Sequence, residues 1–167
     1  MLNLIRIQRL SSDAVLPSKG TRDSTGYDLA SNEDTIINPG ERILVGTGLV
    51  MDLSRLMPEV DVQIRPRSGL AAKNGITVLN SPGTIDRDYR GEIKVILINH
   101  GDSSFVIHKG DRIAQMVFAL AFPLMTFLPV ETVDENTERG AGGIGSTGVK
   151  SAKPKNCCGG GCHNHNR

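Results

Sequence analysis

Two aspartates and a tyrosine stand close together in the middle of the sequence, where they have the types and spacing to do chemistry. They are Asp86, Asp88 and Tyr89. A carboxylate within hydrogen-bond reach of a water molecule can orient that water and accept its proton. The chain has two tyrosines and no tryptophan, so a tyrosine beside these aspartates indicates a specific role for its ring. Taken alone, the same residues also fit a solvated surface turn.

The runs on either side of these residues read as two strands. Residues 76–79 and 92–98 are rich in β-branched side chains, and Pro82, Gly83 and Gly91 between them are typical turn residues. The pattern predicts a β-hairpin whose compact turn holds both aspartates and the tyrosine. A hairpin is a rigid platform, so it can place such groups accurately.

A second candidate site is the segment Arg67-Ser68-Gly69, which precedes a short helical pattern ending at Gly75. Ser68 can cap the helix, and glycine commonly ends one. The free N–H groups of a helix start attract anions. An ordinary serine cap without a ligand explains the same residues.

The glycine-rich segment 140–145 matches the pattern G-x-G-x-x-G. A dinucleotide site is excluded, because the segment follows no strand and has no βαβ unit around it. Ser146 stands where a phosphate-binding P-loop has its lysine, which excludes that loop too. Arg139, Ser146 and Thr147 still offer a cation and two hydroxyls for phosphate, although a plain linker has the same composition.

Three further features allow more than one interpretation. Asp28 follows Gly26 and Tyr27 at a strand start, where a turn acid is the simpler reading. Gln115 lies in an apolar strand, so its amide faces either solvent or a partner. The tail contains Cys157, Cys158, Cys162, His163 and His165, but this spacing fits structural zinc sites poorly. We interpret the tail as disordered, with its metal occupancy open.

Composition limits the class of protein. The net charge is +1, with 19 Lys and Arg against 18 Asp and Glu, so no general attraction to nucleic acid or anionic membrane is expected. Residues 1–10 do not resemble a signal peptide, and the longest apolar run, 116–122, is too short to span a bilayer. The cysteines are confined to the tail, which favours a cytoplasmic protein without disulfides.

Many short strands separated by turns, with one short helix, predict an all-β jelly-roll-like barrel or sandwich. We expect three parts: a β core over 1–135, a flexible glycine-rich arm over 136–149, and a disordered tail over 150–167. The expected strands include 2–10, 41–53, 60–65, 103–108, 112–118 and a last one over 125–130.

The sequence resembles the trimeric dUTPase family. Five motifs of that family occur in order and cover most of residues 25–148: 25–29, 66–71, 83–91, 110–115 and 139–148. The resemblance implies a jelly-roll homotrimer with active sites shared between subunits. It implies Mg²⁺-dependent hydrolysis of dUTP to dUMP and pyrophosphate, which supplies dUMP for dTMP synthesis and keeps uracil out of DNA.

The resemblance also implies roles for single residues. Asp86 would hold and deprotonate the attacking water, and Asp28 would act on Mg²⁺ through water, the ion being otherwise held by substrate phosphates. Uracil and deoxyribose would bind at Asn80, Thr84, Ile85, Tyr89 and Lys94. The phosphates would bind at Arg67, Ser68, Gly69 and Gln115. A lid from a neighbouring subunit would contribute Arg139, Ile144, Gly145, Ser146 and Thr147.

Two departures and two rivals follow from the comparison with the family pattern. Ile144 stands where the family usually has an aromatic ring on uracil, so we expect weaker lid closure, and Thr25 replaces the usual Ala or Ser. A dCTP deaminase of the same fold would need a glutamate at the position of Ile96. A non-catalytic regulatory trimer is the other alternative.

Overall fold

The computed structural model describes residues 4–122 and 125–143. The chain divides into two units, Met1–Met125 and Thr126–Arg167. The first unit holds the β core, and the predicted boundaries at residues 135 and 149 stay predictions. The strand expected over 125–130 is wrong, because these residues have no regular secondary structure. A strand requires a neighbouring strand to accept its hydrogen bonds, and no strand of the described residues is paired with this segment.

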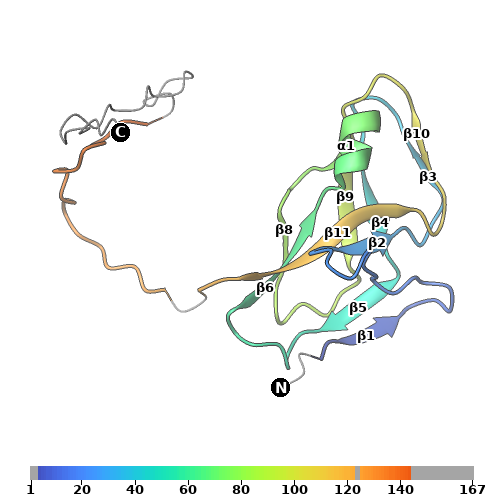
Figure 1. The fold of residues 1–167 in the computed structure, drawn as a ribbon, viewed down its shortest axis with the longest axis horizontal. Coiled ribbons are helices and arrows are strands. Elements are labelled where there is room, and N and C mark those ends of the chain that lie inside the picture. Colours follow the sequence, from blue (N-terminus) through green and yellow to red (C-terminus); the bar gives the residue numbers. More distant parts are fainter. Residues whose placement is uncertain (1–3, 123–124, 144–167) are drawn as a thin grey trace, which may run out of the picture. The chain divides into compact units, whose positions relative to one another are not determined.

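The described residues form eleven strands and one helix (Figure 1). Several strands are only three or four residues long, as expected where turn residues recur every few positions. In chain order the elements are β1 (Arg6–Arg9), β2 (Tyr27–Ala30), β3 (Thr35–Ile37), β4 (Arg42–Gly46), β5 (Leu49–Asp52), β6 (Val60–Arg65), α1 (Ser68–Asn74), β7 (Ile76–Val78), β8 (Gly83–Ile85), β9 (Lys94–Asn99), β10 (Phe105–Ile107) and β11 (Arg112–Leu120).

Antiparallel pairing organises these strands into two main sheets. One has the order β2-β11-β6-β8 and the other the order β4-β9-β7, and the pairs β1-β5 and β10-β3 complete the fold. Apolar side chains of both main sheets, such as Val62, Met116, Val95 and Leu97, belong to one buried core. The predicted all-β class with one short helix is confirmed. No helix among the described residues is long and apolar enough to cross a membrane.

The helix α1 ends where the sequence predicts, but it begins differently. Gly75 ends it in the left-handed conformation (φ 69°), and its N–H donates to the Ala71 carbonyl at 3.1 Å. The expectation that Ser68 caps the helix is wrong: Arg67 occupies the cap position in an extended conformation and forms no side-chain cap bond. The Arg67 side chain turns to other acceptors instead, as described below.

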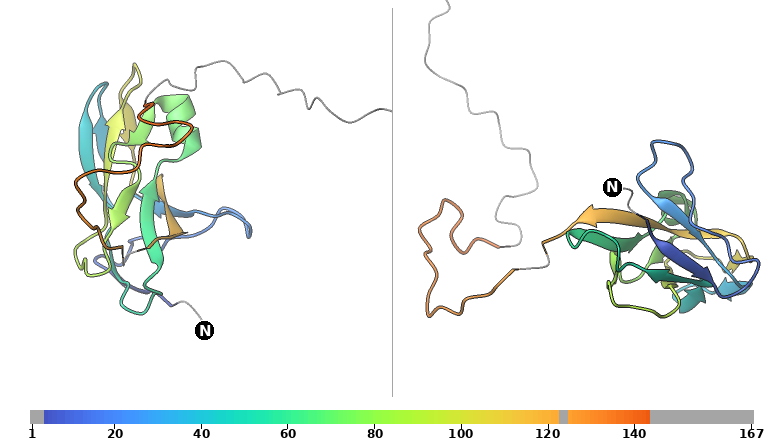
Figure 2. Two further views of the ribbon diagram at one scale, coloured as in Figure 1. Left: turned by 90° about the vertical axis from the view of Figure 1, so that its left-hand side faces the viewer. Right: turned by 90° about the horizontal axis from the view of Figure 1, so that it is seen from below.

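The stretch between β7 and β9 is not the compact turn that the sequence suggests. β7 and β9 do pair, with Ile76 opposite Asn99. Between them the chain crosses to the other main sheet, where β8 pairs with β6 and Ile85 lies opposite Val62 (Figure 2). This excursion places β8 and the turn after it across from β9, with residues of both sheets on either side.

Candidate active site

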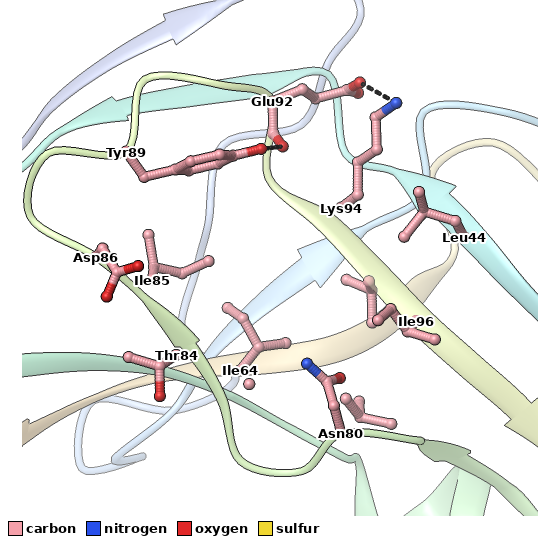
Figure 3. A pocket seen from close by; sticks show the side chains of 13 residues that line it. Leu44, Ile64, Asn80, Thr84, Ile85, Asp86, Tyr89, Glu92, Lys94 and Ile96 are labelled. Atoms are coloured by element: carbon pink, nitrogen blue, oxygen red, sulfur yellow. Dashed lines mark hydrogen bonds and ion pairs between the residues drawn. The ribbon is translucent and has the colours of Figure 1, made fainter.

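A pocket of about 350 Å³ lies between β8, the turn that follows it, and β9 (Figure 3). Both main sheets contribute to its wall. Its floor is apolar, and its polar groups stand around the rim. The lining residues are Leu44, Ile64, Val78, Asn80, Gly83, Thr84, Ile85, Asp86, Tyr89, Glu92, Lys94, Val95 and Ile96.

Asp86 stands at one edge of the pocket, and Lys94 and Glu92 stand at another (Figure 3). Asp86 directly follows β8, so its backbone is fixed by the pairing of β8 with β6. Its side chain is exposed. An exposed carboxylate beside a concave surface can reach both water and a bound molecule, which is the placement a general base needs.

Asn80 lies at the lower end of the pocket in Figure 3, close to the start of β8. A Cβ atom at Gly83 would come within 3.1 Å of its Nδ2 atom, so the glycine leaves room for the amide. A side-chain amide carries both donors and an acceptor. A pocket with an apolar floor and few polar groups is typical of sites that bind one small molecule in one orientation.

Tyr89 covers the upper side of the pocket (Figure 3). Its hydroxyl donates a hydrogen bond to the backbone carbonyl of Glu92 at 2.9 Å. Any side chain at Gly91 would collide with this ring, because a Cβ there would lie 2.6 Å from the Tyr89 Cζ atom. The ring is therefore held at both ends, by its own backbone and by this hydrogen bond.

Arg87 fixes the turn that carries Asp86 and Tyr89 by hydrogen bonds to another loop. The guanidinium of Arg87 donates to the carbonyls of Leu56 at 2.8 Å, Met57 at 3.1 Å and Ser54 at 3.2 Å. These three acceptors lie in the loop between β5 and β6. One side chain thus ties the turn to a neighbouring loop, which restricts its motion.

A second arginine supports the same turn from within. Arg90 donates to the carbonyls of Arg87 at 2.7 Å and Tyr89 at 2.9 Å, and it lies 3.3 Å from the Asp52 carboxylate. The pKa of the Asp52 carboxyl is lowered, chiefly by a hydrogen bond from the Ser54 backbone N–H. The Ser54 hydroxyl and the positive charges of Arg90 and Arg6 lower it further. Asp52 therefore stays ionised and available to Arg90 at neutral pH.

A separate cluster of charged and polar groups forms around Asp28, on β2. Its carboxylate forms an ion pair with Arg67, whose Nε lies 3.2 Å away, and accepts a hydrogen bond from Arg112 Nη1 at 2.9 Å. Arg67 also donates to the Arg112 carbonyl at 2.8 Å. Gln115, opposite Asp28 in the sheet, donates to the Pro66 carbonyl at 2.9 Å. Two guanidiniums and an amide converge here, which suits recognition of phosphate oxygens.

The remaining predicted site residues fall in three places. Ser68 and Gly69 are the first two residues of α1, beside Arg67, and both are exposed. Arg139 belongs to the second unit, where its Nε donates to the Gly142 carbonyl at 2.8 Å. The other lid residues lie outside the described residues; they are Ile144, Gly145, Ser146 and Thr147.

Two polar residues beside these clusters are not among the residues predicted from the sequence. Glu92 contacts both Tyr89 and Lys94, and Arg112 pairs with Asp28. Alternation along the strand predicted over 92–98 can indicate Glu92, because residues two apart share one face and Lys94 is a predicted site residue. The pairing of Arg112 depends on the register of β11 against β2, which has a bulge between Arg112 and Ala114.

Solved structures share the architecture of the β core. The Staphylococcus bacteriophage 80alpha dUTPase, in a variant with dUpNHpp, matches with a TM-score of 0.78 at 23% identity, over 89% of this chain and 100% of that one. The dUTPase from phage phi11 of S. aureus, solved to show coordination of a structural Mg(II) ion, matches with a TM-score of 0.69 at 20% identity, over 79% and 99%. At these identities the match defines the class of fold, the jelly roll of the dUTPases.

Curated relatives found by sequence share a higher identity with this chain than these solved structures do. The dUTPase family model matches residues 12–148. A deoxyuridine 5'-triphosphate nucleotidohydrolase of Nautilia profundicola is 54% identical over 145 residues, covering 86% of this chain and 98% of the relative. One of Rickettsia bellii is 58% identical over 136 residues, covering 80% and 87%. The chain therefore belongs to the dUTPase family.

Proposed function

We propose that this chain hydrolyses dUTP to dUMP and pyrophosphate, supplying dUMP for dTMP synthesis and keeping uracil out of DNA. The observation that carries the proposal is the pocket beside β8. It combines an apolar floor, an amide at Asn80, a fixed aromatic ring at Tyr89 and an exposed carboxylate at Asp86. The relatives at about half identity carry the corresponding name.

The pocket supplies what recognition of deoxyuridine requires. Uracil differs from cytosine in the donors and acceptors along one edge, and backbone groups near Asn80 and Ile85 together with the Asn80 amide can read that edge. The Tyr89 ring would lie flat against the sugar. Because the ring is held by Glu92, it would leave no room for a 2′-hydroxyl.

Asp86 would act as the general base. Its carboxylate would hold a water molecule by hydrogen bonding and take its proton as the water oxygen attacks the α-phosphorus. The new bond is P–O from water, and the bond that breaks joins the α-phosphorus to the bridging oxygen. Pyrophosphate leaves with that oxygen and its electron pair.

The cluster at Asp28 would bind the triphosphate. Arg67, Ser68, Gly69 and Gln115 offer donors to phosphate oxygens there. Among the described residues, no group of three or more His, Cys, Asp or Glu could hold a metal. Mg²⁺ usually keeps waters and binds substrate phosphates with only one or two carboxylates. The residues around Asp28 fit a Mg²⁺ ion that is held by the substrate phosphates. Asp28 would accept a hydrogen bond from a water molecule bound to that ion. The ion would neutralise the charge of the phosphates.

The proposal includes active sites shared between the subunits of a homotrimer. Across β6, Ile85 beside the pocket pairs with Val62, whereas Gln115 of the cluster around Asp28 pairs with Arg65. These two positions on β6 are three residues apart, which is roughly 10 Å along the strand. One copy would supply the pocket and another the cluster around Asp28, with Arg139 and the lid residues 144–147 completing the site.

Deamination of dCTP is disfavoured by the wall of the pocket. Ile96, where a deaminase of this fold would need a glutamate, contributes an apolar side chain to the lining. An aliphatic side chain cannot carry the protons that replacement of an amino group requires.

The test is pyrophosphate release from dUTP, dCTP, dTTP and UTP, each with Mg²⁺. Release from dUTP alone, without ammonia from dCTP, is expected. Equal release from dUTP and UTP would contradict the proposed role of the pocket. Release from none would favour a regulatory protein that uses the pocket for binding.

A further inference from the structure

Glu92 contacts three residues around the pocket, which are Gly48, Lys94 and Tyr89. Its Oε1 atom accepts the Gly48 backbone N–H at 2.8 Å, and its Oε2 atom lies 3.6 Å from Lys94 Nζ. Its backbone carbonyl accepts the Tyr89 hydroxyl at 2.9 Å. Figure 3 shows the tyrosine ring and the lysine converging on Glu92 from two sides.

Two glycines leave space for the Glu92 carboxylate and for the Tyr89 ring. A Cβ atom at Gly46 would come within 2.6 Å of Glu92 Oε1, and one at Gly91 would collide with the Tyr89 ring. Neither glycine has a positive φ. Glycine is therefore required at these two positions by the close approach of neighbouring atoms and not by the backbone conformation.

The anchor for the Glu92 carboxylate is itself well fixed. Gly48 lies between β4 and β5, and the neighbouring Thr47 donates its hydroxyl to the Ile93 carbonyl at 2.7 Å. Ile93 N–H in turn donates to the Leu49 carbonyl at 2.8 Å. Thr47 and Ile93 are both almost fully buried. The turn before β5 is thus a rigid support, and Glu92 joins the tyrosine to it.

We propose that Glu92 is a positioning residue that sets the selectivity of the pocket for deoxyribose over ribose. Its carboxylate is bonded to Gly48, which fixes the carbonyl that holds the Tyr89 hydroxyl. The ring then stays at the depth where a 2′-hydroxyl does not fit. This inference rests on the proposed hydrolysis of dUTP and adds the element that controls its sugar specificity.

The test compares kcat and KM for dUTP and UTP in four variants. Glu92→Ala removes the anchor, so KM for dUTP rises and the ratio of kcat/KM for dUTP over UTP falls about tenfold, with kcat for dUTP little changed. Glu92→Gln keeps an oxygen that can accept from Gly48, and it retains the selectivity of the wild type within about twofold.

Two variants outside the substrate pocket separate the anchor from general effects. Glu33 accepts from the Gly46 N–H at 2.9 Å, on the same turn, without contacting Tyr89. Glu33→Ala removes an equal charge and should leave the selectivity unchanged. Gly46→Ala displaces the Glu92 carboxylate from the opposite side and should lower the selectivity in the same direction as Glu92→Ala.

The outcomes distinguish this inference from the function on which it rests. A wild type that does not hydrolyse dUTP would overturn both. An active wild type with equal dUTP/UTP ratios in Glu92→Ala and Gly46→Ala would overturn only the role of Glu92. Loss of selectivity in Glu92→Gln, equal to that in Glu92→Ala, would also overturn it, because the ion pair with Lys94 would then be the cause. Should Glu92→Ala fail to fold, Gly46→Ala and Glu92→Gln still decide.

Discussion

Individual side chains at the candidate site are held mainly by bonds to backbone atoms. Tyr89 is fixed by a carbonyl of its own turn, Arg87 reaches carbonyls of the loop between β5 and β6, and Arg67 reaches the Arg112 carbonyl at the start of β11. Backbone acceptors are placed by the fold, so such bonds transmit the precision of the sheets to the site. In the cluster around Asp28, Arg67 combines such a backbone bond with an ion pair to the Asp28 carboxylate.

Replacement of Arg67 by lysine tests that dependence. A lysine cannot serve both the Asp28 carboxylate and the Arg112 carbonyl with a planar fork. Loss of one charge-assisted bond, worth about 1.5–3 kcal/mol, should raise KM for dUTP by about tenfold or more. The matched control is Arg65→Lys, because Arg65 bonds to the neighbouring Gln63 side chain. Unchanged KM in Arg67→Lys would contradict a phosphate-binding role.

Residues with a chemistry of their own can be singled out from the sequence. Asp86 and Tyr89 belong to the motif over 83–91, and Asn80 is implied by the family resemblance. The structure gathers the three in one pocket, and their roles stay predictions. Arg112 and Glu92 are not among the predicted site residues, because Arg112 contacts Asp28 on another strand and Glu92 contacts Gly48 in a distant loop. Such contacts depend on register, and register follows from the packing of the whole sheet rather than from local pattern.

Among the elements, the connection through β8 shows where local patterns fail. Its three residues are too few to reveal a period, and its partner β6 lies about twenty positions earlier in the chain. Longer elements were predictable: the alternation over 60–65 became β6, and the glycine at position 75 ended α1. The segment 125–130 has apolar residues, but no strand within 4–122 or 125–143 pairs with it.

The end of α1 provides a stability test at this scale. Gly75 has a positive φ, and a Cβ there would lie 2.5 Å from the Gly101 backbone nitrogen. Gly75→Ala should lower the free energy of unfolding by more than about 2 kcal/mol, measured by urea denaturation.

The matched control for that variant is Gly40→Ala. Gly40 also has a positive φ (75°), but nothing lies within 4 Å of its Cβ position. This variant should lose only about 1 kcal/mol, from backbone strain alone. Equal losses in the two variants would show that the close approach to Gly101 has no energetic consequence.

For the whole molecule, the proposal that subunits share active sites leads to a test of assembly. If different subunits supply Asp86 and Arg139, mixed trimers of Asp86→Asn and Arg139→Ala chains contain some sites with both residues intact. Mixing the two inactive variants should therefore restore part of the dUTP hydrolysis. Absence of recovery, after subunit exchange has been verified by mass spectrometry, would count against shared sites.

The most direct test of the account concerns Asp86 itself. Pyrophosphate release from dUTP with Mg²⁺ should be measured in the wild type, Asp86→Asn and Asp88→Asn. The two aspartates lie in one turn and are both exposed, but only Asp86 lines the pocket with Tyr89. Asp86→Asn should lose about 10²–10⁴-fold in kcat, whereas Asp88→Asn should stay within a fewfold of the wild type. Full activity in Asp86→Asn would contradict the proposed mechanism.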